Sequence, residues 1–119
     1  MSTAKGKQAE DTACKYLEKQ GYSIIERNRR LGRGELDIIA LKGDILVFVE
    51  VKGHQNRESS LDAMHSDKQR RMVSAAQTWL GQHDKYAGYQ CRFDLIVVIP
   101  SNIKLMPVKV EHMLDIIRL

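Results

Sequence analysis

Residues 35–52 read ELDIIALKGDILVFVEVK, which is two largely apolar segments separated by two residues. The segments, Glu35 to Lys42 and Ile45 to Lys52, have the composition of β-strands. Gly43-Asp44 between them is a two-residue connection of the kind that forms a tight hairpin. This stretch therefore predicts two adjacent antiparallel strands at the centre of the fold.

The predicted hairpin brings two carboxylates together. With a two-residue turn, Lys42 pairs with Ile45, and the same count pairs Asp37 with Glu50. Because strand side chains alternate between faces, Asp37, Glu50 and Lys52 project from the same side. Directly opposed residues have Cβ atoms about 4.5–5.5 Å apart. The sequence thus predicts a carboxylate pair with a lysine two residues along the same strand.

Residue types alone leave two interpretations of this charge cluster open. In one, a divalent cation such as Mg²⁺ or Mn²⁺ neutralises Asp37 and Glu50, because hard cations prefer oxygen ligands. Lys52 would then assist metal-dependent hydrolysis of a phosphodiester. In the other, Lys52 or a nearby arginine forms a salt bridge with Glu50, and Asp37 lies at an exposed strand end. An isolated Glu-x-Lys is too common to decide between them.

Amphipathic helices are predicted before and after the hairpin. Apolar residues recur at spacings of three and four over residues 4–20 and again over residues 66–80. Gly21 lies where a helix C-cap glycine belongs, and Ser66 is of the type that caps helix N-termini. On the second helix, Trp79 is expected to be a core residue.

Further strands complete a mixed α/β domain. They are expected over residues 22–28, 93–99 and 103–110, with an amphipathic helical end after the last of them. The arginine-rich segment 29–34 is expected to end the first strand. The predicted order is helix, three-strand antiparallel meander, helix, strand and a small C-terminal tail. A length of 119 residues suits a single domain, residues 1–119.

Composition narrows the class of protein. No window approaches the roughly 18 apolar residues of a membrane span, and the N-terminus lacks the apolar stretch of a signal peptide. Cys14 and Cys91 are too few and too far apart for a disulfide framework or a cysteine-rich zinc site. We therefore expect a cytoplasmic protein with two reduced thiols and no membrane contact.

Positive charge is concentrated beside the predicted site. The formal net charge is +4, which is compatible with a polyanionic partner. Two clusters hold many of the basic side chains: Arg27, Arg29, Arg30 and Arg33, and then Lys68, Arg70 and Arg71. Clusters on both sides of the hairpin in sequence favour contact with nucleic-acid phosphates, which carries no base specificity.

These motifs resemble a known group of nucleases. Asp37 followed by Glu50-Val51-Lys52 at the end of an apolar strand is similar to the PD-(D/E)xK signature of restriction-endonuclease-like proteins. From about residue 6 to about residue 97 the chain looks like the bacterial YraN family of inferred endonucleases. The segments that carry this likeness are Gly34–Ala40, Leu46–Lys52, Arg92-Phe93-Asp94, Glu10-Asp11, Tyr16-Leu17, Gly21-Tyr22 and Lys68–Arg71. The resemblance implies a restriction-endonuclease-like α/β core.

The resemblance also implies roles for individual residues. Asp37 and Glu50 would be metal ligands, with the carbonyl oxygen of Val51 as a further ligand. Lys52 would be the catalytic lysine. Glu10, on the first helix, matches an acidic residue that archaeal Holliday-junction resolvases of the same fold use near the metal.

The resulting expectation is a Mg²⁺- or Mn²⁺-dependent endonuclease acting on DNA, including branched or repair intermediates. Contacts with nucleic acid are expected from Arg27, Arg29, Arg30, Arg33, His54, Lys68, Gln69 and Arg71. His54 departs from the resembled family, which tends to have an arginine just past the Glu-x-Lys. Two other classes remain open: a nucleic-acid-binding module without cleavage, and an assembly factor whose hairpin charges form structural bridges. DNA versus RNA and a homodimeric state also remain open, and cutting a symmetric junction would require a two-fold dimer.

Overall fold

The computed structural model describes residues 4–53, 63–100 and 108–117. In chain order the elements are α1 (Ala4–Lys19), β1 (Ser23–Leu31), β2 (Gly34–Lys42), β3 (Ile45–Gly53), α3 (Ser66–Gly81), the 3₁₀ helix η1 (Asp84–Tyr86), β4 (Gln90–Ile99) and β5 (Lys109–Met113). The strands form one sheet in the order β1-β2-β3-β4-β5. Neighbouring strands are antiparallel except β3 and β4, which are parallel. The predicted α/β order is confirmed.

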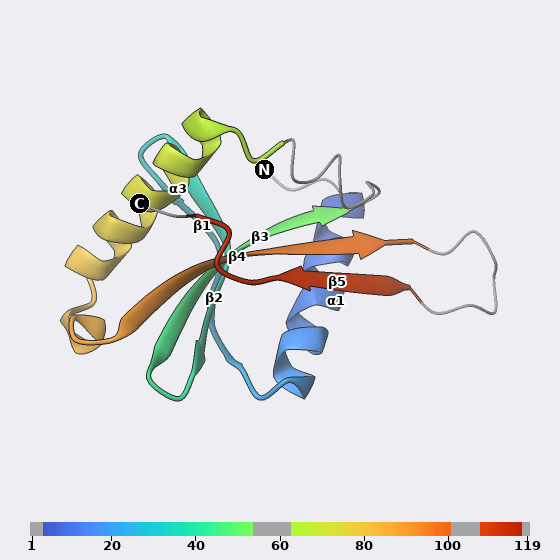
Figure 1. Cartoon of the computed structure of the whole chain (residues 1–119), viewed down its shortest axis with the longest axis horizontal. Coiled ribbons are helices and arrows are strands. Elements are labelled where there is room, and N and C mark those ends of the chain that lie inside the picture. Colours follow the sequence, from blue (N-terminus) through green and yellow to red (C-terminus); the bar gives the residue numbers. More distant parts are fainter. Residues whose placement is uncertain (1–3, 54–62, 101–107, 118–119) are drawn as a thin grey trace.

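The sheet lies between the two α-helices, with a hydrophobic core on each face (Figure 1). On one face, Leu17 of α1 packs in a cluster with Ile38 and Val47. On the other, Trp79 of α3 is fully buried, and its ring meets that of Phe48 edge-on at 6.0 Å between centroids. Trp79 is therefore the core residue that its sequence position predicted. Neither α1 nor α3, the described α-helices, is long and apolar enough to cross a membrane.

The β2–β3 hairpin has the predicted register over its apolar part. Lys42 pairs with Ile45, and the ladder continues to Ile38 and Val49. The pairing stops there, one position before the expected pair of Asp37 and Glu50. The regular pairing of the two strands therefore ends where the carboxylates lie, and Val51 N there donates to the side chain of Asp37.

β1 is longer than predicted. It continues to Leu31, so Arg29 and Arg30 are strand residues, paired with Leu36 and Glu35 of β2. The expectation that the arginine-rich segment ends the strand was wrong. Hydrogen bonding to β2 keeps residues 29–31 in the strand although their composition does not favour it. Strand propensity depends heavily on such context. Asn28, at a φ of 53°, lies within this extension.

Of the two predicted helix caps, the one at the end of α1 is confirmed and the one at the start of α3 is wrong. Gly21 ends α1 with a φ of 93°, and Tyr22 N donates to Leu17 O at 2.9 Å, as the C-cap prediction requires. The N-cap of α3 is His65 rather than the predicted Ser66. The ring Nδ1 of His65 accepts a hydrogen bond from Lys68 N at 3.4 Å and so serves as the capping acceptor.

The C-terminal segment differs from its prediction. β5 extends to Met113, and residues 114–117 form no helix. Asp115 has a φ of 58°, which interrupts helical geometry, and its N–H donates to the Asp94 carboxylate rather than within a helical turn. Ile117 is nevertheless buried in the core beneath α3. Residues 101–107, where most of the predicted 103–110 strand falls, lie outside the described part of the chain.

Gly34 begins β2 directly against α3. A Cβ at this position would lie 2.2 Å from the carbonyl oxygen of Arg71 and 2.9 Å from the Cβ of Ala75. The carbonyl belongs to the helix backbone and cannot rotate away as a flexible side chain could. The absence of a side chain at Gly34 therefore sets the distance between the β1–β2 turn and α3.

Replacing Gly34 with alanine should destabilise the protein by about 1–3 kcal/mol, because overpacking against a fixed backbone forces the turn and helix apart. Urea unfolding followed by circular dichroism would measure the change. Gly81→Ala is the matched control, since nothing lies within 4 Å of a Cβ added there. Equal stability of the two variants would show that the turn is not held against α3.

Candidate metal site and nucleic-acid interface

Asp37 and Glu50 are buried at the point where the regular pairing of β2 and β3 ends. Asp37 is 8% exposed and Glu50 only 3%. Leu36 and Ile38, on either side of Asp37, are fully buried and belong to different cores, so the strand is anchored on both faces. Asp37 Oδ2 accepts a hydrogen bond from Val51 N at 2.9 Å. The alternative in which Asp37 lies at an exposed strand end is therefore excluded.

The electrostatic environment of Asp37 favours the protonated acid. Burial, followed by the negative charge of Glu50, raises the pKa of Asp37 to about 8. The hydrogen bond from Val51 lowers this pKa, whereas the negative charges of Glu10 and Glu35 raise it further by smaller amounts. Among the described residues, no positive charge offsets the burial of Asp37 and its repulsion by Glu50. A cation bound between the two carboxylates would offset both.

Two lysines contact the other carboxylate. Lys52 Nζ lies 3.3 Å and Lys68 Nζ 3.1 Å from Glu50 Oε1. Glu50 Oε2 is buried and has no hydrogen-bond partner in the described part of the chain. The salt-bridge interpretation thus accounts for one oxygen of Glu50. It leaves the second oxygen of Glu50, and Asp37, without a cation among the described residues.

These oxygens fit a hard divalent cation. Mg²⁺ commonly takes one or two carboxylates and completes its shell with waters and substrate phosphate oxygens. Asp37 and Glu50 supply the carboxylates, and the peptide of Val51 adjoins Asp37 through its N–H. Among residues 4–53, 63–100 and 108–117, no three histidine, cysteine, aspartate or glutamate side chains gather as a metal-binding group. The fit therefore rests on two carboxylates rather than three.

Glu10 is close to this site but does not complete it. It is 6% exposed on α1, and its Oε1 lies 3.8 Å from Arg27 Nη2. Its charge contributes to the raised pKa of Asp37, so the two carboxylates interact electrostatically. The described residues nevertheless hold no three-carboxylate cluster with Glu10 as a member. Its catalytic role stays a prediction.

The predicted arginine cluster is divided by the fold. Arg27 Nη2 donates to Asp11 Oδ1 at 2.7 Å and so joins β1 to α1. Arg29 Nη2 donates to Gln82 Oε1 at 3.2 Å, beyond the end of α3. These two guanidinium groups are engaged within the protein and in different places. Their contact with nucleic-acid phosphates stays a prediction.

The other basic residues converge. A cavity of about 160 Å³ lies between the β1–β2 turn and α3, and its lining residues are Arg30, Arg33, Gly34, Glu35, Lys68, Arg71 and Met72. Members of both sequence clusters thus meet in one place. The close approach at Gly34 is the reason, because it brings the turn against the first turns of α3.

Two further predicted contacts are not placed at the site. Gln69 Nε2 donates to Met64 O at 2.7 Å, so this amide supports the segment before α3. Gln69 also lines a separate cavity with Val73 and Ile117, away from the carboxylates. His54 lies outside the described residues.

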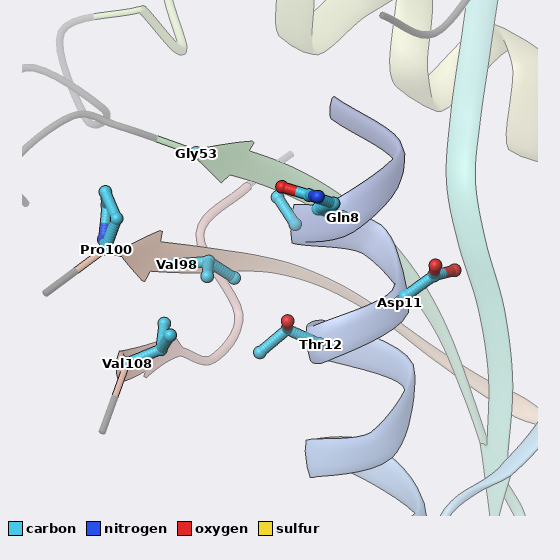
Figure 2. Close-up of a pocket in the computed structure, with 8 residues that line it drawn as sticks. Gln8, Asp11, Thr12, Gly53, Val98, Pro100 and Val108 are labelled. Carbon is cyan, nitrogen blue, oxygen red and sulfur yellow. The ribbon is translucent and has the colours of Figure 1, made fainter. Parts of the chain in front are cut away.

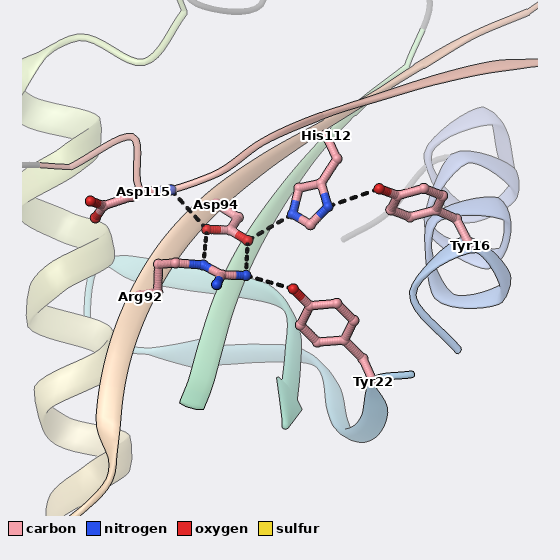
Figure 3. A network of polar contacts seen from close by, with 6 residues as sticks. All are labelled: Tyr16, Tyr22, Arg92, Asp94, His112 and Asp115. Carbon is pink, nitrogen blue, oxygen red and sulfur yellow. Dashed lines mark hydrogen bonds and ion pairs between the residues drawn. The ribbon is translucent and has the colours of Figure 1, made fainter. Parts of the chain in front are cut away.

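A buried polar network that the sequence did not reveal surrounds Asp94 (Figure 3). Asp94 is fully buried and accepts hydrogen bonds from Arg92 Nε and Nη2, each at 2.9 Å. Its carboxylate also lies 2.7 Å from His112 Nε2 and accepts from Asp115 N at 2.9 Å. Tyr16 OH completes the chain at 3.0 Å from His112 Nδ1. The network joins β4, β5 and α1.

The protonation state of Asp94 follows from these contacts. Burial acts to raise its pKa, but the hydrogen bonds from His112, Arg92 and Asp115 outweigh burial and lower it. The Asp94 hydrogen bond in turn raises the pKa of Arg92. The side chain of His112 is only 7% exposed, and its isolated position in the sequence does not predict this burial. The available signal was Arg92-x-Asp94 within an otherwise apolar strand, and its partners are too distant in sequence to identify.

A second cavity, of about 330 Å³, lies between α1 and the ends of β3, β4 and β5 (Figure 2). Apolar or small side chains form much of its wall: Ala9, Gly53, Val98, Pro100 and Val108, with Gln8, Asp11 and Thr12 from α1. Neither Asp37 nor Glu50 lines it. This cavity is therefore separate from the candidate metal site.

A mixed sheet covered by two helices, with a buried carboxylate pair where the hairpin pairing ends, defines an α/β protein with a candidate metal site. Comparison with known proteins identifies the family. The model of the Uncharacterised protein family UPF0102 matches residues 9–98, and the chain belongs to this family. The YraN-like resemblance of the sequence is thereby confirmed.

Relatives in several bacteria cover most of the chain. A UPF0102 protein of Magnetococcus marinus is 44% identical over 95 residues, which are 78% of this chain and 77% of that protein. One from Pseudomonas aeruginosa is 38% identical over 103 residues, 85% of this chain and 82% of the relative. One from Alcanivorax borkumensis is 40% identical over 99 residues, covering 82% and 79%. The candidate site lies within the matched region of the family model.

Proposed function

We propose that the protein is a divalent-metal-dependent endonuclease that hydrolyses phosphodiester bonds in DNA. The buried Asp37–Glu50 pair carries this proposal, because the cations among the described residues contact one of its four oxygens, Glu50 Oε1. A structural salt bridge would not require a second buried carboxylate. The similarity of Asp37 and Glu50-Val51-Lys52 to the PD-(D/E)xK signature supports the same class.

Each residue has a distinct part in this proposal. Asp37, Glu50 and the carbonyl oxygen of Val51 would hold Mg²⁺ or Mn²⁺, which when bound activates water and neutralises charge at the phosphate. Lys52 carries its ammonium beside Glu50 and can donate a hydrogen bond to a phosphate oxygen as negative charge develops there. Lys68, on α3, orients the Glu50 carboxylate through its ion pair. Glu10 adds negative potential from α1.

The basic residues would bind the substrate backbone. Arg30, Arg33, Lys68 and Arg71 lie together and can contact phosphates without selecting a base sequence. Affinity would therefore fall steeply with salt. Two free cysteines fit the proposed cytoplasmic location. A two-fold dimer would accompany cleavage of a symmetric four-way junction.

A cleavage assay tests the function directly. Wild-type protein and Asp37→Asn would be incubated with labelled single-stranded, duplex, flapped and four-way-junction DNA and with one RNA, in Mn²⁺ or in EDTA. Cleavage should require both the metal and Asp37. Asp44→Asn is the matched control, because it makes the same chemical change on the exposed hairpin loop.

The other outcomes distinguish the alternative classes. Binding of one or more substrates without cleavage would favour a nucleic-acid-binding module that retains the fold. Neither binding nor cleavage would favour an assembly factor in which Lys52 and Lys68 simply balance Glu50. Cleavage that survives Asp37→Asn would remove the carboxylate pair from the mechanism.

A further inference from the structure

The cavity between the β1–β2 turn and α3 concentrates positive charge. Four basic residues line it, together with one carboxylate, Glu35. Arg30 comes from β1, Arg33 from the β1–β2 turn, and Lys68 and Arg71 from α3. Four positive charges and one negative give the lining a net charge of +3, which becomes +2 when Glu50, the ion-pair partner of Lys68, is included. In the described part of the chain, Arg30, Arg33 and Arg71 form no ion pair. The cavity therefore attracts an anion that the protein itself does not supply.

The size of the cavity indicates what kind of anion fits. About 160 Å³ is well below the roughly 300–1,000 Å³ of pockets that hold whole small molecules. A single phosphate group is the appropriate size, and a complete nucleotide is not. Guanidinium groups match phosphate oxygens in bidentate geometry, which favours phosphate over a smaller monovalent anion.

The position of the cavity links it to the candidate metal site. Lys68 lines the cavity, and its Nζ lies 3.1 Å from Glu50 Oε1. Glu35, on the cavity wall, is two residues from Asp37 along β2. The contact of Gly34 with the α3 backbone fixes the spacing of the two walls. A phosphate held here would lie beside the carboxylate pair at a defined separation.

We propose that this cavity binds the terminal phosphate of a nucleic-acid strand, which makes the protein selective for substrates with a phosphorylated strand end near the scissile bond. A terminal phosphate carries a charge of about −1.5 to −2 at pH 7, more than the single charge of an internal phosphodiester. The net positive charge of the lining therefore attracts the terminal group more strongly. A small recess also admits a strand end readily, whereas an internal phosphate must enter with chain on both sides. This inference rests on the proposed nuclease function.

Binding without metal tests the proposal independently of catalysis. Fluorescence anisotropy in EDTA would compare single-stranded oligonucleotides with a 5′-phosphate, a 3′-phosphate or hydroxyl ends, each labelled at the opposite end, with inorganic phosphate as competitor. One of the phosphorylated oligonucleotides should bind about tenfold more tightly than its hydroxyl counterpart. The variant Arg33→Ala/Arg71→Ala should weaken binding of both kinds of oligonucleotide, but about tenfold more for the phosphorylated one, so that the preference for the phosphorylated end disappears. Arg70→Ala/Lys85→Ala, which removes the same charge from residues that do not line the cavity, should retain the gain.

The outcomes separate this proposal from the proposed function. Equal affinity for phosphate and hydroxyl ends, or equal losses in both double variants, would overturn the terminal-phosphate site. Competition by inorganic phosphate without any preference for phosphorylated ends would also overturn it and indicate a free anion as ligand. Cleavage of the same oligonucleotides in Mn²⁺ without end preference would support the nuclease function and overturn the terminal-phosphate site. A preference for phosphorylated ends, together with no cleavage of any substrate in the cleavage assay above, would support the site and contradict the nuclease.

Discussion

The metal-free protein should lose stability as the pH rises from about 4 to about 8, and Asp37→Asn should remove that loss. The pKa of the Asp37 carboxyl is about 8 in the folded chain, because of burial and the charge of Glu50, and about 3.9 when unfolded. Across this interval the folded state binds the proton more strongly, so each step toward alkaline pH costs stability. The expected loss is on the order of 2–5 kcal/mol. The amide of the variant cannot ionise, yet its oxygen can still accept the hydrogen bond from Val51.

A divalent cation should reverse this loss in the wild type. At pH 8, Mg²⁺ or Mn²⁺ at about 100 times its Kd should stabilise the folded state by about 2.7 kcal/mol. Thermal unfolding at pH 5 and pH 8, with metal or with EDTA, would measure both effects. Asp44→Asn should behave as the wild type does. A metal response that persists in Asp37→Asn, or is missing from the wild type, would support the structural-bridge interpretation.

Asp94→Asn should destabilise the protein by about 3–5 kcal/mol, the usual cost of breaking a buried ion pair by removing one partner. The change leaves the Arg92 guanidinium, 18% exposed, without a counter-charge and turns an amide group toward hydrogen-bond donors. It also weakens the attachment of β5, because His112 and Asp115 both contact the Asp94 carboxylate. Chemical denaturation would measure the loss, with Asp44→Asn again as control.

The pH dependence gives the Asp94 prediction a second test. Because its pKa is lowered on folding, the contribution of Asp94 is fully present above the unfolded value of about 3.9. It is lost as the pH falls through the folded value. The acid part of the wild-type stability profile should therefore be shallower in Asp94→Asn. If Asp94→Asn had wild-type stability at pH 7, the hydrogen bonds and ion pairs of Asp94 would contribute nothing to stability beyond what water provides.

Local patterns in the sequence predicted the centre of the fold well. Gly43-Asp44 determined the hairpin register as far as Ile38 and Val49, because turn length and strand alternation act over a few residues. The apolar stripes of both helices were equally local signals. The sequence left the burial of Asp37 open. The structure buries both Asp37 and Glu50, since each lies in an apolar strand whose flanking residues enter the core.

Contacts between distant segments could not be predicted in this way. Lys68 reaches Glu50 only because α3 crosses the sheet, and nothing in the composition of either segment specifies that crossing. The division of the arginines likewise depends on the fold, which places Asp11 beside Arg27. The Asp94 network has the same origin, since Tyr16 and His112 are 96 residues apart.

The parallel pairing of β3 with β4 has a kinetic consequence. The β2–β3 hairpin closes through a two-residue turn and can form within about 1–10 μs. Val47, by contrast, must find Arg92 across a connection that contains α3, and contacts at such separation form slowly. Refolding should therefore bring Asp37 and Glu50 together before Lys68 arrives to compensate them. Alkaline conditions should slow the early phase, and a divalent cation present at that stage should accelerate it, so that the metal would assist the folding of the site as well as its chemistry.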